Sequence, residues 1–193
     1  MSATIMSLFE DTALFQGQQR QELCTGAVVL RGFAFAQATA LYEEVDGVTS
    51  RAPFRHMVTP GGVCMSVAMT NCGSYGWVSD STGYRYDPRD PHNGQNWPEM
   101  PDIFLKLAQN AAAAAGFDNY VPDACLINRY DPGTRVSMHQ DKDERDREAP
   151  IVSVSLGISA VFLWGGLQRQ DKPIRIPLFH GDVMVWGGSA RFR

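Results

Sequence analysis

The residues best suited to chemistry lie in one short segment after the middle of the chain. His139 and Asp141 are separated by a single residue, so on an extended backbone both side chains project from the same face and can share one ion. An imidazole and a carboxylate are two of the three protein ligands of the 2-His-1-carboxylate triad, which leaves positions on a non-haem Fe(II) open for co-substrate and oxygen. The pair alone is a weak signal, because a surface histidine beside a carboxylate has the same pattern.

Neighbouring polar residues strengthen the iron interpretation. Asn128 and Tyr130 lie on one face of a predicted strand and would offer an amide and a phenol to a dicarboxylate. The acidic cluster formed by Asp141, Asp143, Glu144 and Asp146 is an alternative calcium loop. The D-x-D-x-D-G spacing and the closing glutamate of such a loop are absent, which favours iron over calcium.

Strands dominate the elements that must position these residues. Residues 102–115 predict a helix, because Ile103, Leu107 and Ala111 recur at four-residue spacing between Pro101 and Gly116. A second helix is predicted at about 37–46. Strands are predicted at 26–30, 63–70, 123–130, 150–156, 160–164, 174–178 and 182–186. The expected fold class is α+β and strand-rich, a sandwich or jelly roll with the helices packed outside.

Composition narrows the function classes. The 193 residues hold 17 Lys and Arg against 21 Asp and Glu, a net charge of −4, so a nucleic-acid partner would need a local basic rim. The longest apolar stretches are about half the ~20 residues that cross a bilayer, so no membrane span is predicted. The four cysteines form no C-x-x-C pair and are expected to be reduced, which together with the absence of a signal-peptide pattern favours the cytoplasm.

From Gly26 onward the sequence resembles the AlkB family of iron- and 2-oxoglutarate-dependent nucleic-acid dealkylases, in its bacterial form. The resemblance implies a double-stranded β-helix (jelly-roll) dioxygenase domain at 26–193 after an N-terminal extension at 1–25, with a nucleotide-recognition lid at about 50–100. The segments that carry it are MVTPGG at 57–62, MSVAMTNCG at 65–73, PDACLINRY at 122–130, HQDKDE at 139–144, APIVSVSLG at 149–157, HGDV at 180–183 and VWGG at 185–188.

The resemblance also implies roles for individual residues. His139 and Asp141 become the iron ligands and catalytic residues. The 2-oxoglutarate pocket is formed by Leu126, Asn128, Arg129 and Tyr130. The substrate-binding residues are Thr59, Ser66, Trp77, Tyr84, Arg85, Tyr86, Asp143 and Arg169.

Physical chemistry agrees with these roles but leaves alternatives. A flipped base needs flat apolar surfaces, and Trp77, Tyr84 and Tyr86 lie in a segment, 71–100, that is too long to be a simple connector. The same aromatic residues could instead pack this segment onto the sheet. A carboxylate at Asp143 would favour a cationic N-methylated base over a neutral one, although a solvated surface acid has the same sequence pattern.

The family's third iron ligand, a histidine shortly after the Trp-Gly-Gly turn, and the arginines that follow it have no counterpart before Arg193. We therefore expect a truncated form of a complete enzyme, impaired as it stands. His180 is the only candidate substitute and is expected to be structural. His56 and His92 are expected to be surface residues in loops.

The activity that the resemblance implies is oxidative demethylation of 1-methyladenine and 3-methylcytosine in DNA, and also in RNA. Fe(II) is the cofactor, 2-oxoglutarate and O₂ are co-substrates, and formaldehyde, succinate and CO₂ are released. A monomer that prefers single-stranded DNA is expected. The alternatives are an inactive fragment, a non-catalytic binder of alkylated nucleic acid, and a hydroxylase of another substrate.

Overall fold

The computed structural model describes residues 19–141, 144, 146–168 and 170–193. Two of the predicted substrate contacts, Asp143 and Arg169, lie outside these residues. The helices are η2 (Phe35–Gln37), α1 (Ala38–Arg51), α2 (Asp102–Ala115) and η3 (Gly188–Phe192). The strands are β1 (Arg20–Cys24), β2 (Ala27–Leu30), β3 (Arg55–Val58), β4 (Cys64–Gly73), β5 (Gly76–Asp80), β6 (Gly83–Asp87), β7 (Ala124–Arg129), β8 (Ile151–Val154), β9 (Ala160–Trp164), β10 (Ile174–Leu178) and β11 (Val183–Trp186).

The helix α2 has the bounds that the sequence predicts. It begins after Pro101 and ends at Gly116, whose φ of 92° is the left-handed conformation that glycine adopts most easily. The helix α1 continues to Arg51, five residues beyond the predicted end at 46. The reason is its apolar face: Leu41 and Val48 are both buried, so packing carries the helix past Gly47.

The sheet β1-β2-β11-β8 holds the main core. Every residue of its two central strands, β2 and β11, is buried, because each face of the sheet is covered. On one face, Val183 and Val185 pack with Leu107 and Ala111 of α2. On the other face, Met184 and Trp186 pack against the β9–β10 pair. The result is the expected strand-rich jelly roll with helices outside, confirmed below by comparison with a solved structure.

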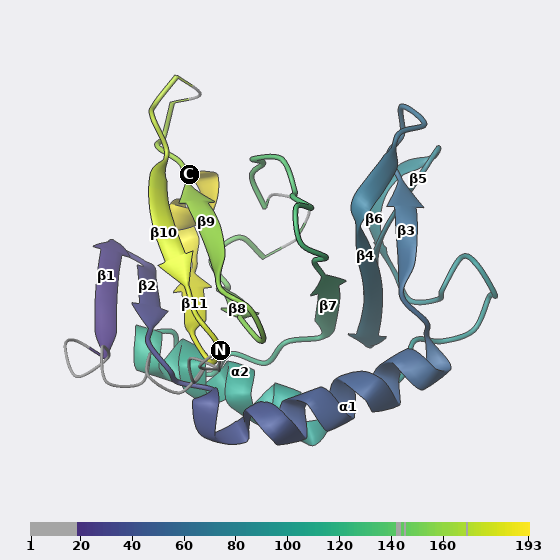
Figure 1. Ribbon diagram of the computed structural model, residues 1–193, viewed down its shortest axis with the longest axis horizontal. Coiled ribbons are helices and arrows are strands. Elements are labelled where there is room, and N and C mark those ends of the chain that lie inside the picture. The colour runs from purple at the N-terminus through teal and green to yellow at the C-terminus, as the bar shows by residue number, and fades with distance from the viewer. Residues whose placement is uncertain (1–18, 142–143, 145, 169) are drawn as a thin grey trace, which may run out of the picture.

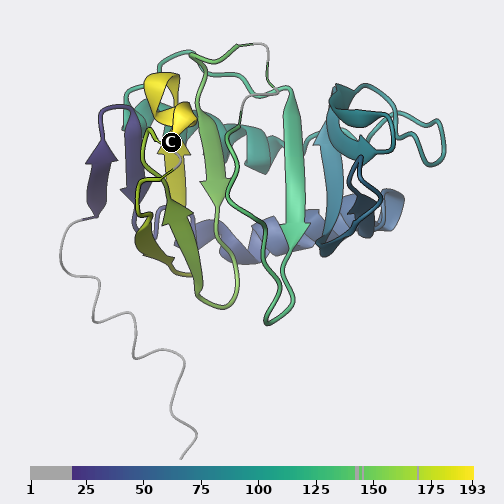
Figure 2. The same cartoon turned by 90° about the horizontal axis from the view of Figure 1, so that it is seen from above.

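The remaining strands form a second group beside this core. Strands β3, β4 and β7 make a three-stranded sheet, and β5 and β6 form a hairpin. Figures 1 and 2 show α1 running beneath both groups, with β7 between the core sheet and β4. Strand β7 thus lies between the core sheet and the part of the molecule that carries the predicted lid.

The local structure differs from the sequence predictions at the segment 71–100, at two strands and at His56. The segment 71–100, in which the sequence predicts no strand, contains the end of β4 and the whole β5–β6 hairpin. Its strands are short and rich in Gly, Tyr and Asp, so they give no alternating apolar signal; the buried ring of Trp97, packed with Ala52 and Val78, anchors the segment instead. Strands β1 and β3 were also missed, and His56 lies in β3 rather than in a loop.

None of the described helices is long and apolar enough to span a membrane.

Candidate active site

The predicted metal pair is brought together by the segment that follows β7. His139 Nε2 lies 3.3 Å from Asp141 Oδ1, with His139 61% exposed and Asp141 29% exposed. The His139 Nδ1 atom is 2.8 Å from the main-chain oxygen of Ser137. Since a carbonyl can only accept, Nδ1 must carry the proton of that hydrogen bond.

This tautomer makes the pair suitable for a metal. With the proton on Nδ1, a neutral His139 presents the lone pair of Nε2 towards Asp141. Two acceptors 3.3 Å apart repel each other unless a cation, either a second imidazole proton or a metal ion, lies with them. A ring nitrogen bonded to a main-chain carbonyl is also the arrangement that orients histidine ligands in metal sites. The donor set therefore fits a divalent metal such as Fe(II).

A buried arginine holds the main chain beside this pair. We call the described residues 139–141, 144 and 146–149 the metal loop. Arg191 of η3 is 2% exposed and donates to the main-chain oxygen of Asp141 from Nε (3.2 Å) and Nη2 (3.0 Å). Its Nη1 donates to the main-chain oxygens of Asp146 and Ala149, each at 3.1 Å. Nη2 also pairs with the carboxylate of Glu144.

The predicted 2-oxoglutarate residues lie along β7 and just after it. Leu126 and Tyr130 are 36% and 51% exposed, and with Asn128 they share one face by the alternation of the strand. Arg129 belongs to the opposite face, where its guanidinium lies 5.1 Å from the centre of the Phe54 ring. Loss of solvation raises the pKa of the Tyr130 phenol, so at neutral pH it is a hydrogen-bond donor.

In the predicted lid, Trp77 and Tyr84 form a stacked pair. Their ring centres are 5.7 Å apart at an interplanar angle of 18°, across the β5–β6 register. The position of Trp77 is fixed by a residue that the sequence analysis did not single out. Asn71 is fully buried; its Oδ1 accepts from Trp77 N and its Nδ2 donates to Trp77 O, both at 3.0 Å. A polar residue at an inward position of a strand is the only sequence signal for this role.

Tyr86 connects the hairpin to the metal loop. Its hydroxyl donates to Glu144 Oε1 at 2.7 Å, and burial, followed by this bond, raises its pKa. Arg85 points elsewhere and is held inside the hairpin by Asp80 (2.9 Å) and Asp87 (3.3 Å). The structure therefore brings Tyr86, but not Arg85, next to the metal loop.

The other predicted groove residues serve local structure. Thr59 Oγ1 accepts from Val63 N at 3.1 Å and closes the turn between β3 and β4. Ser66 Oγ donates to the main-chain oxygen of Arg135 at 3.1 Å, which ties β4 to the chain leading into His139. Ser66 thus lies near the site, whereas Thr59 has the contacts of a turn residue.

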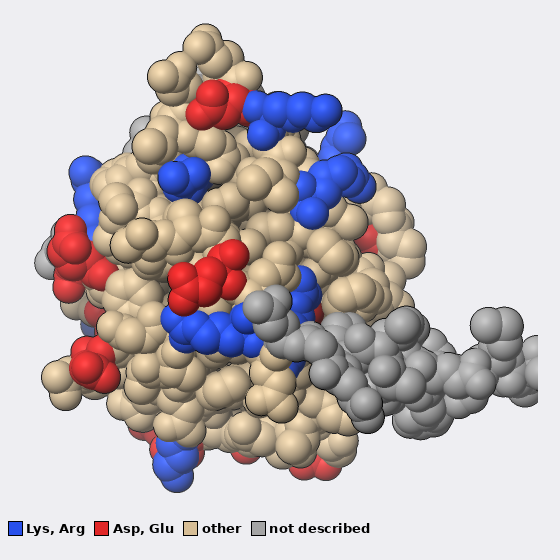
Figure 3. All heavy atoms as spheres, turned by 90° about the vertical axis from the view of Figure 1, so that its left-hand side faces the viewer, with Lys and Arg blue, Asp and Glu red and all other residues tan. Residues whose placement is uncertain are grey.

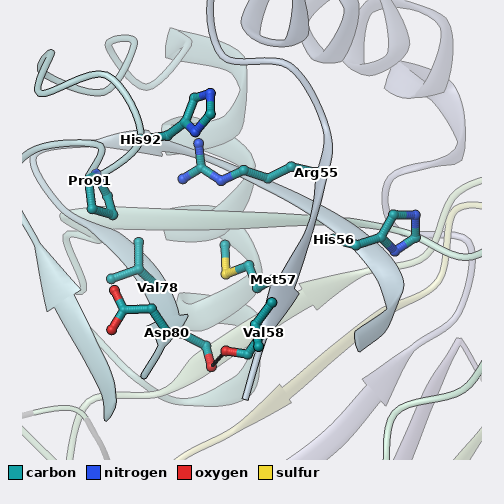
Figure 4. Close-up of a pocket in the computed structure, with 9 residues that line it drawn as sticks. Arg55, His56, Met57, Val58, Val78, Asp80, Pro91 and His92 are labelled. Carbon is teal, nitrogen blue, oxygen red and sulfur yellow. Dashed lines mark hydrogen bonds between the residues drawn. The ribbon is translucent and has the colours of Figure 1, made fainter. Parts of the chain in front are cut away.

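The remaining histidines have separate surroundings. His180 Nδ1 accepts from Gly157 N at 3.0 Å and its ring stacks on Tyr42, which are the contacts of a packing residue. Figure 4 shows a cavity of about 260 Å³ lined by β3, β5 and the turn with His92. His56 points away from His92 there, and Arg55 is paired with Asp90 at 2.6 Å. None of its lining residues belongs to the metal loop.

Comparison with known proteins identifies the family to which this chain belongs. The model of the 2OG-Fe(II) oxygenase superfamily matches residues 26–193. The chain is 54% identical over 187 residues to the alpha-ketoglutarate-dependent dioxygenase AlkB of Escherichia coli (strain K12), covering 97% of this chain and 85% of that protein. The chain belongs to the AlkB family. Members of this family are Fe(II)- and 2-oxoglutarate-dependent dioxygenases, and the enzyme class, the Fe(II) cofactor and the co-substrates 2-oxoglutarate and O₂ are thereby confirmed.

More distant AlkB relatives support the same fold. The solved structure of OsALKBH1 superposes with a TM-score of 0.77 at 28% identity, covering 89% of this chain and 84% of that one. The nucleic acid dioxygenase ALKBH1 of Homo sapiens is 32% identical over 115 residues, covering 60% of this chain and 29% of that protein.

The AlkB metal centre needs a third protein ligand beyond His139 and Asp141. Within the part of the chain that the structure describes, no group of three or more His, Cys, Asp or Glu residues is placed to hold a metal ion. The two residues predicted from the sequence are thus the metal-binding pair that the described structure offers, and their role remains a prediction.

Proposed function

We propose that this protein oxidatively demethylates N-alkylated bases, such as 1-methyladenine and 3-methylcytosine, in DNA and also in RNA. The observation that supports this proposal best is the hydrogen bond that joins the lid hairpin to the metal loop. The His139–Asp141 pair suits Fe(II), and the Trp77–Tyr84 stack belongs to a hairpin that is hydrogen bonded to the same loop through Tyr86 and Glu144. An aromatic surface beside a metal pair is what oxidation of a flipped base requires.

Each group has a proposed task. His139 and Asp141 would hold Fe(II), which when bound lets 2-oxoglutarate and O₂ oxidise a methyl group. Asn128 and Tyr130 would bind the 2-oxoglutarate carboxylates by hydrogen bonds, and Leu126 would supply an apolar wall. Trp77 would stack on the base or on its neighbour. Arg129 lies on the other face of β7 and is left out of the proposed pocket.

The proposed reaction balances. One oxygen atom of O₂ enters the methyl C–H bond and the other enters the succinate formed when 2-oxoglutarate loses CO₂. The N–CH₂OH product then breaks at its N–C bond: the bonding electron pair returns to the ring nitrogen, the hydroxyl group loses its proton to solvent, and formaldehyde and the unmodified base are released. The chain's own contribution is orientation: the bond from Tyr86 to Glu144 holds the hairpin against the metal loop.

The electrostatics favour local rather than global attraction of nucleic acid. On the face in Figure 3, Lys and Arg lie interspersed with Asp and Glu, in line with the net charge of −4. We therefore propose single-stranded nucleic acid as the preferred form, because stacking on aromatic residues binds exposed bases without a large basic surface. We also propose that the protein is a monomer, that residues at about 50–100 form the lid, and that the protein works in the cytoplasm. The thiols of Cys72 and Cys125 are neighbours across β4 and β7 but are not joined in a disulfide, which suits a reducing compartment.

The test is formaldehyde release from a 1-methyladenine oligonucleotide with Fe(II) and 2-oxoglutarate. The 193-residue chain is assayed beside a chimera that adds the C-terminal remainder of the Escherichia coli relative. Formaldehyde from either protein, dependent on both Fe(II) and 2-oxoglutarate, supports the proposal. If both consume 2-oxoglutarate but release no formaldehyde from methylated DNA or RNA, the substrate is of another class. Oligonucleotide binding without any turnover would indicate a non-catalytic binder.

A further inference from the structure

The metal loop has a shape that its own backbone does not fix. Its described residues form neither a helix nor a strand, so no ladder of main-chain hydrogen bonds holds His139 and Asp141 in place. The His139 side chain itself is 61% exposed. The Ser137 carbonyl orients the His139 ring, and contacts from outside the loop fix where the main chain of Asp141 lies relative to it.

Arg191 has the contacts for that task. Its guanidinium lies where three main-chain oxygens of the loop converge, those of Asp141, Asp146 and Ala149. These residues stand on both sides of the described part of the loop, so one rigid, planar group joins its beginning to its end. A second contact from η3 reinforces the first: Gln140 Nε2 donates to the main-chain oxygen of Phe192 at 2.7 Å.

The charge of Arg191 is balanced within the same network. A buried cation is costly unless it is paired and fully hydrogen bonded, and the partner here is Glu144. The second oxygen of that carboxylate accepts from Tyr86 of β6. A continuous chain of bonds thus runs from the lid hairpin through Glu144 and Arg191 to the main chain of Asp141.

We propose that Arg191 is the positioning residue of the metal site, and that the Arg191–Glu144–Tyr86 chain sets the position of the lid hairpin relative to the His139–Asp141 pair. The inference rests on the proposed function in one respect, since it assumes that the metal binds at these two residues. It adds that the geometry of the pair is controlled from η3, by a side chain that touches neither the metal nor the substrate.

The test compares two arginine variants. Arg191→Lys keeps the charge, but a point-like ammonium cannot bridge three separated carbonyls. Arg31→Lys is the matched control, because Arg31, just after β2, is also a mostly buried arginine, bonded to Asp182 (2.6 Å) and to the Pro177 oxygen (2.7 Å) far from the metal loop in the sequence. Both variants are expected to lower the melting temperature.

Two further measurements separate positioning from stability. In Arg191→Lys, hydrogen exchange of the 137–149 peptide should quicken about tenfold as the loop opens locally, and Co(II) should bind roughly 10–100-fold more weakly. Arg31→Lys should leave both values at those of the unmodified protein. Equal effects of the two substitutions, or unchanged exchange in Arg191→Lys, would overturn the proposal.

Tyr86→Phe provides an independent test of the coupling between hairpin and metal loop if Arg191→Lys does not fold. It removes one hydroxyl from the chain of bonds, so exchange should quicken in the 137–149 peptide as well as in the hairpin. Exchange confined to the hairpin would contradict the coupling. Should the unmodified protein fail to bind Co(II), the metal assignment fails, while the exchange measurements still decide whether Arg191 holds the loop.

Discussion

His139 Nε2 and Asp141 Oδ1 face each other at 3.3 Å, while the Nδ1 proton on the far side of the ring is donated to the Ser137 carbonyl. A metal ion would relieve the contact between two acceptors by binding both.

Asp141→Ala and His139→Ala should each abolish Fe(II)-dependent turnover, because a single remaining ligand of the pair cannot hold the ion. Co(II) titration followed by visible absorption measures the loss directly. Asp118→Ala, which removes an exposed carboxylate outside the loop, is the control and should bind Co(II) normally. Unchanged Co(II) affinity in Asp141→Ala would place the metal elsewhere.

Trp77→Ala should weaken binding of a methylated oligonucleotide by roughly 1–3 kcal/mol, the usual contribution of one base–aromatic stack. Fluorescence anisotropy of a labelled oligonucleotide provides the measurement. Metal affinity should not change, and neither should oligonucleotide binding in Phe33→Ala, an exposed aromatic residue beyond β2. A lower melting temperature with unaltered oligonucleotide binding would show that Trp77 is a packing residue only.

Asn71→Ala should lower the free energy of unfolding by roughly 1–3 kcal/mol, because it removes the Asn71 partners of the part-buried N–H and C=O of Trp77. Urea denaturation measures this change, with Asn110→Ala on the exposed side of α2 as the matched control. Oligonucleotide affinity should fall as well, since the indole loses its support. Stability within 0.5 kcal/mol of the control would contradict the assignment.

Cys64 should react first with a thiol reagent. It is exposed, whereas Cys72 is fully buried, and the hydrogen bond to Cys125 together with burial raises the pKa of the Cys72 thiol. Because the thiolate is the nucleophile, Cys72 stays protonated and inert up to mildly alkaline pH. Mass spectrometry after maleimide labelling at pH 8 checks the order, and Cys64→Ser should remove the first adduct. Early labelling of Cys72 in the folded protein would refute it.

Acid should destabilise the protein through the Arg55–Asp90 pair. Burial opposes ionisation of Asp90, but hydrogen bonds from the Arg55 guanidinium and the His92 amide outweigh it and lower its pKa. A carboxyl group with a lowered folded-state pKa adds stability above its unfolded value of about 3.9, and this stability is lost as the pH falls below it. Thermal unfolding between pH 2 and 6 should therefore show a smaller slope in Asp90→Asn than in the unmodified protein. Identical slopes would exclude the pair as a cause.

The features predicted from the sequence are those with a local signal. Helix α2 has regular apolar spacing and clear end residues, and His139 and Asp141 are two positions apart in the chain. The β5–β6 hairpin was missed because its strands pair mainly with each other and bury few side chains, so residues such as Tyr84 and Arg85 leave no alternating pattern.

The partners of Arg191 could not have been predicted at all. Its hydrogen bonds go mostly to main-chain oxygens. Because every residue has such an oxygen, the sequence does not indicate which residues Arg191 contacts. The same holds for Asn71 and the backbone of Trp77. Side chains that bind backbone become recognisable only when distant segments are placed side by side.

Arg191 follows Trp186, the last residue of β11, by only five positions, and β11 is buried on both faces. A fluctuation that withdrew the guanidinium would have to disturb the strand that both halves of the core share, which is among the last parts of a protein to open. The hairpin β5–β6 begins three positions after β4, whose residues 67–72 are also buried. Fluctuations of the hairpin and of the metal loop should therefore be correlated, because each is attached to a buried strand and the two are joined by the bonds of Glu144 to Tyr86 and Arg191.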